Sequence, residues 1–198
     1  MRDQVLAFNR RLAAEGAVIR GARADYTARL QTHLLTHRGL GGLVPGGIPT
    51  LTYRPSGTAA GGAEPALEAA LRSAMDDRLE DELRRGHALV GPHRDDVEFA
   101  IGDLSLGRFG SSGQQRAALI ALKLAKLFIH KEMHGEYPIL LLDDVDSELD
   151  AERTERALDL LDGPFQAIVA SARAAEWAPH RPVTHHLEVR GGILRALS

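Results

Sequence analysis

The sequence predicts an α/β fold joined to a helical subdomain. Three observations support this: two long segments of helical periodicity near the amino end, a continuous apolar run at Ile139–Leu142, and alternating strands and helices from there to the carboxyl end. Elements that each carry an apolar face must pack into layers around a shared core. We therefore expect a helical subdomain over residues 1–86 and an α/β portion over residues 87–198.

The composition is that of an ordinary globular protein. Of the 198 residues, 44% are hydrophobic and 26% are charged, with a formal net charge of -3. A nucleic-acid partner would need a local basic patch, because the overall field weakly repels phosphate. The absence of cysteine excludes disulfides, thiolate metal sites and cysteine nucleophiles. No apolar run approaches the roughly 20 residues that cross a bilayer, and no signal-peptide pattern is present, so a cytoplasmic protein without a membrane partner is expected.

The first predicted helix covers residues 3–38. Its apolar side chains recur largely every seven residues, which predicts one buried stripe. The stripe consists of Val5, Phe8, Leu12, Ile19, Tyr26, Leu30 and Leu34. Gly16 and Gly21 are expected to weaken this helix by up to ~1 kcal/mol each.

A second helix is predicted to begin near Pro65, a residue suited to the first helical turn. Leucine or methionine follows at strict four-residue spacing from Leu67 to Leu83. The two apolar stripes are expected to pack against one another. Between the helices, residues 39–47 form a glycine-rich loop, residues 48–54 have strand-like alternation, and residues 55–62 form a second connection.

The α/β portion is predicted from residue 88 onward. We expect a short strand at 88–90, a hairpin of 97–101 with 104–106, and a deeply buried helix over 113–131. The run Ile139–Leu142 predicts a central parallel strand covered on both faces. A helix over 152–161, a strand over 165–170 and a final hairpin over 187–194 complete the pattern.

A glycine-serine segment, Gly110–Arg116, lies at the start of the buried helix. Free backbone N–H groups at a helix start, flanked by small residues, can bind an anionic oxygen. The alternative is structural, with Ser111 as an N-cap and Gly113 as a turn residue.

An acid pair, Asp143-Asp144, follows the apolar strand. Ligands bind at the carboxyl edge of parallel sheets, and two adjacent carboxylates favour a cation there. Magnesium fits, since it takes hard oxygen ligands and shares them with phosphates. The alternative is a solvated acidic turn that caps the next helix.

Together, these motifs resemble those of ABC-type ATPases. Gly110–Arg116 is similar to their signature motif, Ile139–Asp144 to their Walker B strand, and Ser147–Asp150 to their D-loop. Leu89–Asp96, Leu122–Ala125 and the first helix from Phe8 to Leu30 further resemble the RecF family. The resemblance implies the carboxyl-terminal part of an ABC-type ATPase head, a P-loop NTPase lobe, with a helical subdomain.

The RecF resemblance also implies roles for individual residues. Asp143 would hold Mg²⁺ through water. Asp144 would polarise the attacking water, and most relatives have glutamate instead of aspartate at this position. ATP bound by a second subunit would be contacted in trans by Ser111, Ser112, Gly113 and Gln114. Ser147 and Asp150 of the D-loop would cross the same interface. Only Ser171 remains at the switch strand, where the family usually carries threonine.

The Walker A pattern G-x-x-x-x-G-K-[ST] occurs nowhere in the sequence. We therefore expect a piece of a longer protein, or one product of a split or truncated gene, that does not hydrolyse ATP alone. The resemblance implies gap repair with double-stranded or gapped DNA, RecR and RecO-type mediators, and a homodimer or the missing amino-terminal half as partners. The alternatives are a non-catalytic DNA- or partner-binding module and a transporter ATPase subunit.

Two groups of basic residues leave alternatives open. His93 and Arg94 form either a nucleotide or DNA contact, or a structural pair in which Arg94 bridges to Asp95 or Asp96. The remaining arginines form either a DNA-facing strip or an ordinary solvated surface. This second group consists of Arg10, Arg11, Arg20, Arg23, Arg84 and Arg85.

Overall fold

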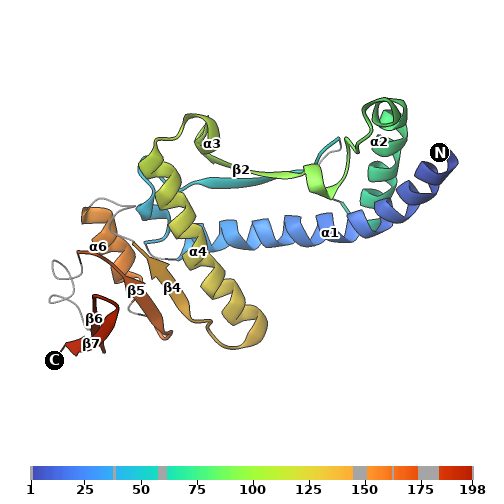
Figure 1. Cartoon of the computed structure of the whole chain (residues 1–198). Coiled ribbons are helices and arrows are strands. Elements are labelled where there is room, and N and C mark those ends of the chain that lie inside the picture. Colours follow the sequence, from blue (N-terminus) through green and yellow to red (C-terminus); the bar gives the residue numbers. More distant parts are fainter. Residues whose placement is uncertain are drawn as a thin grey trace.

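The computed structural model describes residues 2–37, 39–57, 62–144, 151–161, 163–173 and 183–197. A long helix, α1 (Arg2–Thr36), runs through the molecule with α2 (Glu64–Arg85) packed beside its amino-terminal part (Figure 1). The helix α4 (Ser112–His134) crosses the other end of α1 and is followed by the strand β4 (Leu140–Asp143).

The predicted packing of the first two helices is confirmed, but the predicted face of α1 is wrong. Leu71 and Met75 of α2 are buried with Ala13, as the four-residue spacing in α2 predicts. On α1, however, the predicted stripe is largely outside the core in its first half, where Phe8 is 73% exposed and Ile19 is also exposed. The buried face there is instead made of small and polar side chains.

Gly16 explains why this smaller face is the one that packs. A Cβ at residue 16 would lie 2.6 Å from Leu71 Cδ2 and 3.3 Å from Pro92 Cγ, so α2 and the segment after it approach the α1 backbone closely. Gly16 is therefore a packing residue of the interface between α1 and α2. This corrects the expectation that it merely weakens the helix.

A three-stranded antiparallel sheet lies alongside α1, in the order β1 (Thr50–Arg54), β2 (Asp96–Ile101), β3 (Leu104–Ser105). The predicted alternation of β1 is confirmed, with Leu51 and Tyr53 buried between exposed threonines. The hairpin strand predicted to reach residue 106 ends earlier, because Leu106 begins the short helix α3 (Leu106–Phe109). Residue 88 has no regular structure and residues 89–90 form a bend, so the strand predicted there is wrong.

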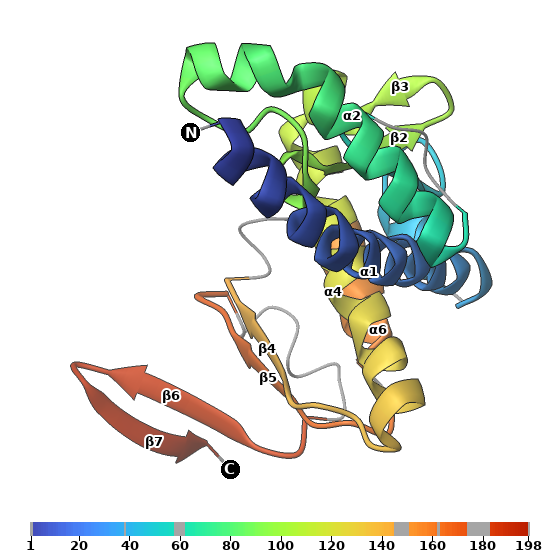
Figure 2. The same ribbon diagram turned by 90° about the vertical axis from the view of Figure 1, so that its right-hand side faces the viewer.

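The larger core lies between α4, the carboxyl-terminal half of α1 and the β4–β5 sheet. Strand β5 (Ala167–Ala170) pairs with β4 in parallel, and α6 (Ala151–Asp159) lies between them in the chain, as predicted for a strand–helix–strand unit. Figure 2 shows α4 beside these strands and running in the opposite direction to β4. Buried residues from all these parts meet in one cluster, including Leu34, Leu124, Leu140 and Ala157.

Only one face of the β4–β5 sheet is covered by the described residues. Leu140 and Leu142 are buried, whereas Leu141 is 67% exposed and Ile168 on β5 is 54% exposed. The expectation of a strand covered on both faces is therefore wrong for this chain. A parallel sheet is normally covered on both sides, so this apolar face needs a partner.

The chain closes with an antiparallel hairpin of β6 (His186–Arg190) and β7 (Ile193–Leu197), as predicted. The boundary proposed near residue 86 stays a prediction. Strand β1 lies before that boundary and pairs with β2 after it, from Thr50 opposite Ala100 to Arg54 opposite Asp96. The helical and α/β portions therefore share one small sheet.

Candidate functional site

The glycine-serine segment forms the start of α4, and Ser111 is its N-cap. Ser111 Oγ accepts the N–H of Gln114 at 3.2 Å, and Gln114 Oε1 accepts the N–H of Ser111 at 2.9 Å. This reciprocal capping box satisfies two of the N–H groups that a helix start leaves without partners. The structural alternative for Ser111 is thus borne out in this state of the chain, and the proposed phosphate contact stays a prediction.

The two small residues after Ser111 leave the helix start open. Ser112 and Gly113 are exposed, and a Cβ built on Gly113 would meet no atom within 4 Å. The first helical bond joins the Gln115 N–H to the Ser111 carbonyl, so the N–H groups of Ser112 and Gly113 precede the helical pattern. These two groups are available to an anionic oxygen.

Both glutamines of the segment are anchored to the chain itself. Gln114 Nε2 donates to the Pro45 carbonyl at 2.9 Å, and Gln115 Nε2 donates to the Leu106 carbonyl at 2.8 Å. The amide of Gln114 is therefore engaged at both ends within its own chain. These anchors set the position of the α4 start relative to the loop that follows α1.

The acid pair lies at the carboxyl edge of the β4–β5 sheet, as predicted. Asp143 pairs in register with Ala170, and the Asp144 N–H donates to the Ala170 carbonyl at 2.9 Å. Asp143 and Asp144 are exposed, and the next residue after β5 is Ser171. The hydroxyl of Ser171 accepts the Arg173 N–H at 3.0 Å. The predicted switch position and the acid pair therefore share one sheet edge.

Asp144 has an unusual backbone conformation. Its φ of 52° makes it the one non-glycine residue with positive φ in the described part of the chain. This left-handed conformation costs an L-residue roughly 1–2 kcal/mol, and aspartate is among the residues that tolerate it best. Such strain concentrates at functional positions, which supports a role for this aspartate.

The two motifs lie on separate elements of the chain. Helix α4 has 23 residues and β4 has four, so they are about 34 Å and about 13 Å long. Strand β4 runs in the opposite direction to α4 (Figure 2). The glycine-serine segment is at the first turn of α4, and the acid pair is at the carboxyl end of β4.

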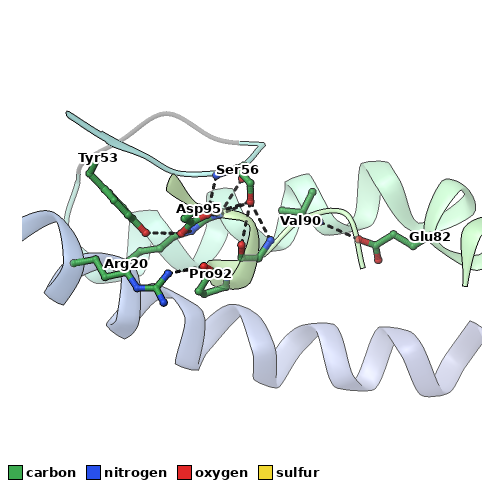
Figure 3. Close-up of polar contacts among 9 residues, drawn as sticks. Arg20, Tyr53, Ser56, Glu82, Val90, Pro92 and Asp95 are labelled. Atoms are coloured by element: carbon green, nitrogen blue, oxygen red, sulfur yellow. Dashed lines mark hydrogen bonds and ion pairs between the residues drawn. The ribbon is translucent and has the colours of Figure 1, made fainter. Parts of the chain in front are cut away.

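The Leu89–Asp96 block is built around a buried ion pair between Asp95 and Arg20 (Figure 3). Arg20 Nε donates to Asp95 Oδ2 at 3.0 Å and Arg20 Nη2 to Oδ1 at 2.8 Å, while the hydroxyl of Tyr53 donates to Oδ2. The Ser56 N–H donates to Oδ1 at 2.8 Å. The block therefore ties α1 to the end of β1.

The pKa values of this cluster follow from its contacts. Burial raises the pKa of Asp95, but hydrogen bonds from Arg20, Tyr53 and Ser56 outweigh it, and the net shift is downward. Burial, together with the hydrogen bond to Asp95, raises the pKa of Tyr53 to about 12. Asp95 is thus a charged structural residue at neutral pH.

The structure corrects the ion pair that was proposed for Arg94. Arg94 donates from Nε and Nη2 to the Ala88 carbonyl at 3.2 Å each, so the proposed bridge to Asp95 or Asp96 is wrong. The partner of Asp95 is Arg20, which sequence spacing did not indicate. His93 and Arg94 are both exposed, and their contact with nucleotide or DNA stays a prediction.

The predicted arginine strip is also changed by the structure. Arg20 is buried and cannot face DNA. Arg23 donates to the Pro92 carbonyl, and Arg84 pairs with Asp81. A different basic row, which the sequence analysis did not single out, follows the exposed face of α4. Its signal was the three- and four-residue spacing of Lys123, Lys126 and His130 opposite the apolar face.

Ser147 and Asp150 lie outside the described residues, so the D-loop is not placed.

Two further results concern metals and membranes. Within the described ranges, no group of three histidine or acidic side chains could hold a metal ion. In the same ranges, none of the helices is long and apolar enough to cross a bilayer.

The fold and its motifs define the class of protein as the head of an ABC-type ATPase. The whole chain superposes on the recombination mediator protein RecF with ATPrS in the RecFOR pathway, with a TM-score of 0.77, 27% identity, and coverage of 52% of that chain. The RecF-ATP structure gives a TM-score of 0.76 and 28% identity over 99% of this chain and 51% of that chain.

Sequence relatives identify the family. The DNA replication and repair protein RecF of Chlorobium phaeovibrioides is 38% identical over 176 residues, covering 86% of this chain and 46% of the relative. RecF of Roseiflexus castenholzii is 36% identical over 178 residues, covering 88% and 44%. No family model matches. The chain belongs to the RecF family and spans about half the length of the curated relatives it matches.

Proposed function

We propose that this chain supplies the signature, Walker B and D-loop part of a RecF-like DNA-repair ATPase, in which two heads close around ATP. The observation that carries the proposal is that its two exposed motifs lie on separate elements, at the start of α4 and at the carboxyl end of β4. Separated motifs of this kind suit a pocket to which one chain gives its acid pair and another gives its signature helix.

The residues present fit a nucleotide phosphate and Mg²⁺. Ser112 and Gly113 offer free N–H groups at the start of a long helix, where the helix dipole favours an anion. Asp143 offers an exposed carboxylate, a ligand type that Mg²⁺ accepts directly or through water. Bound Mg²⁺ would supply neutralisation of the phosphate charge. The solved RecF structures contain ATP or ATPrS, which supports the assignment of nucleotide to this chain.

We assign the chemical step to Asp144. Phosphoryl transfer needs mainly positioning and charge stabilisation, and Asp144 would orient and polarise the attacking water. Ser111 would contact the γ-phosphate held by a second subunit, and Ser147 and Asp150 would cross the same interface. An aspartate at position 144 has a shorter side chain than glutamate, so we expect slow turnover.

We propose that another polypeptide segment covers the open face of the β4–β5 sheet. Leu141 and Ile168 expose apolar surface there, on the side opposite Leu140. The RecF relatives are about twice as long as this chain. The part of those proteins that this chain does not span, with its phosphate-binding loop, would cover that face and complete the pocket.

The broader assignment follows the names of the relatives. They are DNA replication and repair proteins, and the solved structures belong to the RecFOR pathway. We accordingly propose duplex or gapped DNA, RecR and RecO-type mediators, and a second head as partners, acting in the cytoplasm. These relatives favour the repair ATPase over a transporter subunit.

Reconstitution tests the proposal. The chain is mixed with the amino-terminal half of the Chlorobium phaeovibrioides relative, and phosphate release from ATP is measured together with association by light scattering. We expect hydrolysis only in the mixture. Asp144→Asn should keep ATP-dependent association and lose turnover by at least about 100-fold, a typical size for loss of a catalytic general acid or base.

Ser111→Arg should abolish ATP-dependent association, because the new side chain obstructs the phosphate approach. Ala69→Arg, which adds the same side chain on the exposed surface of α2, is the matched control and should associate normally. Normal association of Ser111→Arg would contradict the trans contact. Association without hydrolysis in the wild-type mixture would instead favour the non-catalytic binding module.

A further inference from the structure

A row of basic residues runs along the exposed face of α4. It begins at Arg116, the last residue of the glycine-serine segment, and continues toward the carboxyl end of the helix. Side chains three or four residues apart share one face of a helix. The basic residues on this face are Arg116, Lys123, Lys126, His130 and His134, and the exposed Leu119 and Met133 lie among them. The row spans about 27 Å at the helical rise. In a chain of net charge -3 it is a local concentration of positive charge.

The lysines of this row have no acidic partner in the described part of the chain. Neither Lys123 nor Lys126 lies within ion-pair distance of a carboxylate there, whereas Arg20, Arg54 and Arg84 each have one. The single acid of α4, Glu132, bonds His33 instead, at 3.2 Å. Among the residues that the structure describes, no carboxylate therefore compensates the positive charge of the two lysines.

A groove lies beside this row, and four of the basic residues line it. The groove has a volume of about 430 Å³ and is lined on the α4 side by Lys123, Lys126, His130 and His134. Its other wall includes Leu140 and Leu141 of the β4 strand. Leu141 also belongs to the sheet face that the part outside this chain would cover, so the contact with anionic groups is assigned to the cations on the α4 side of the groove.

The chemistry of the row restricts its occupant. Burying several cations under another polypeptide is costly unless carboxylates pair with them. A linear row of cations suits a linear row of phosphates, because duplex DNA carries one negative charge per roughly 1.7 Å of its axis. The row offers no Phe, Tyr or Trp, and Tyr26 is the one such residue that lines the groove, so a series of aromatic side chains on which successive bases could stack is missing.

We propose that the exposed face of α4 and its groove bind the sugar–phosphate backbone of duplex DNA. The choice of DNA depends on the proposed repair function. The contact is independent of base sequence, and it places DNA on the helix whose first turn carries the signature motif. DNA and nucleotide would then act on the two parts of one rigid element.

The test measures binding of the 198-residue chain to a labelled 30-base-pair duplex by fluorescence anisotropy, without nucleotide, at several salt concentrations. The variant Lys123→Glu/Lys126→Glu should bind at least about 10-fold more weakly. Its slope of log affinity against log salt should fall by about 2, since each phosphate contact contributes about 0.9.

The matched control is Arg29→Glu/Arg72→Glu, which makes the same change in net charge on the exposed surfaces of α1 and α2. It should keep affinity within about 3-fold, and circular dichroism checks that both variants are folded. Should the glutamate pair unfold the chain, Lys123→Gln/Lys126→Gln replaces it, with a slope again reduced by about 2.

Three results would overturn the proposal: no binding of duplex by the wild-type chain, equal loss in both charge-reversal variants, or lysine-dependent binding of poly-glutamate in preference to DNA. The last result would identify an acidic polypeptide as the partner. DNA binding is measured without nucleotide, and hydrolysis by the reconstituted wild-type mixture is measured without DNA. Failure of this inference is therefore distinct from failure of the proposed function.

Discussion

Arg20 and Asp95, 75 positions apart in the sequence, form a two-bond ion pair in the interior, with N–O distances of 3.0 and 2.8 Å. The Arg20 side chain is 2% exposed and that of Asp95 is fully buried. Because Asp95 also accepts hydrogen bonds from Tyr53 and Ser56, this pair connects α1, β1 and the segment before β2. Three testable predictions concern this contact, and two more concern the glycines of α1 and the backbone of Asp144.

Removing one partner of the buried pair should strongly destabilise the chain. Arg20→Ala leaves an uncompensated carboxylate in the interior, at a cost of about 3–5 kcal/mol in the free energy of unfolding. Arg84→Ala is the matched control, because Arg84 also pairs with an aspartate but its side chain is 75% exposed. Its cost should stay below about 1 kcal/mol. Urea unfolding measures both, and equal losses would contradict the structural role of the pair.

The same cluster should make stability fall at high pH. The folded-state pKa of Tyr53 is about 12, above its ordinary value of 10, so the folded chain keeps a proton that the unfolded chain releases. This stability is present below pH 10 and is lost as pH rises through 12. Between these values the wild type should lose about 2 kcal/mol more than Tyr53→Phe. Urea unfolding at pH 9 and 12 provides the comparison; parallel losses in the two proteins would rule out the assignment.

The stability of the chain should also fall at low pH, because Asp95 becomes protonated. The pKa of Asp95 is lowered in the folded state, so the stability it provides is present above its unfolded pKa and is lost as pH falls through the folded one. Asp95→Asn should therefore flatten the acid limb of the stability profile relative to wild type. Unfolding followed from pH 6 down to pH 2 tests this, and an unchanged acid limb in the variant would refute it.

Two glycines in α1 should respond oppositely to alanine. Alanine is favoured over glycine by up to about 1 kcal/mol in a helix interior, and a Cβ on Gly21 would meet no atom within 4 Å, so Gly21→Ala should stabilise the chain. At Gly16 the Cβ would meet the fully buried Leu71, and overpacking should cost about 1–3 kcal/mol. Thermal unfolding of the two variants compares them. A gain at both positions would show that α1 and α2 are not closely packed.

The left-handed backbone of Asp144 should govern which substitutions the chain tolerates. Glycine and asparagine adopt this conformation readily, so Asp144→Asn and Asp144→Gly should be as stable as wild type or more so. Asp144→Ala should lose about 1 kcal/mol. Chemical unfolding ranks the three variants. If Asp144→Ala is as stable as Asp144→Gly, residue 144 does not have the left-handed backbone described here.

Much of the fold was predictable because its signals are local. Helical periodicity located α2 and α4, alternation located β1, and the apolar runs located β4 and β5. The acid pair was placed correctly at the sheet edge, because a parallel strand always delivers its last residues there. The face of α1 was predicted wrongly because apolar spacing cannot show that a glycine lets a neighbouring helix approach.

The sequence by itself determined the order of elements, the two motifs and the family they resemble, since each depends on residues close together in the chain. Only the tertiary structure decided that Arg20 is buried, that Arg20 and not Arg94 pairs with Asp95, and that Lys123 and Lys126 lie on an exposed face of α4. These outcomes depend on which segments, distant in the sequence, pack together in the fold. A buried ion pair joins residues from such segments, so neighbouring residues in the sequence do not reveal it.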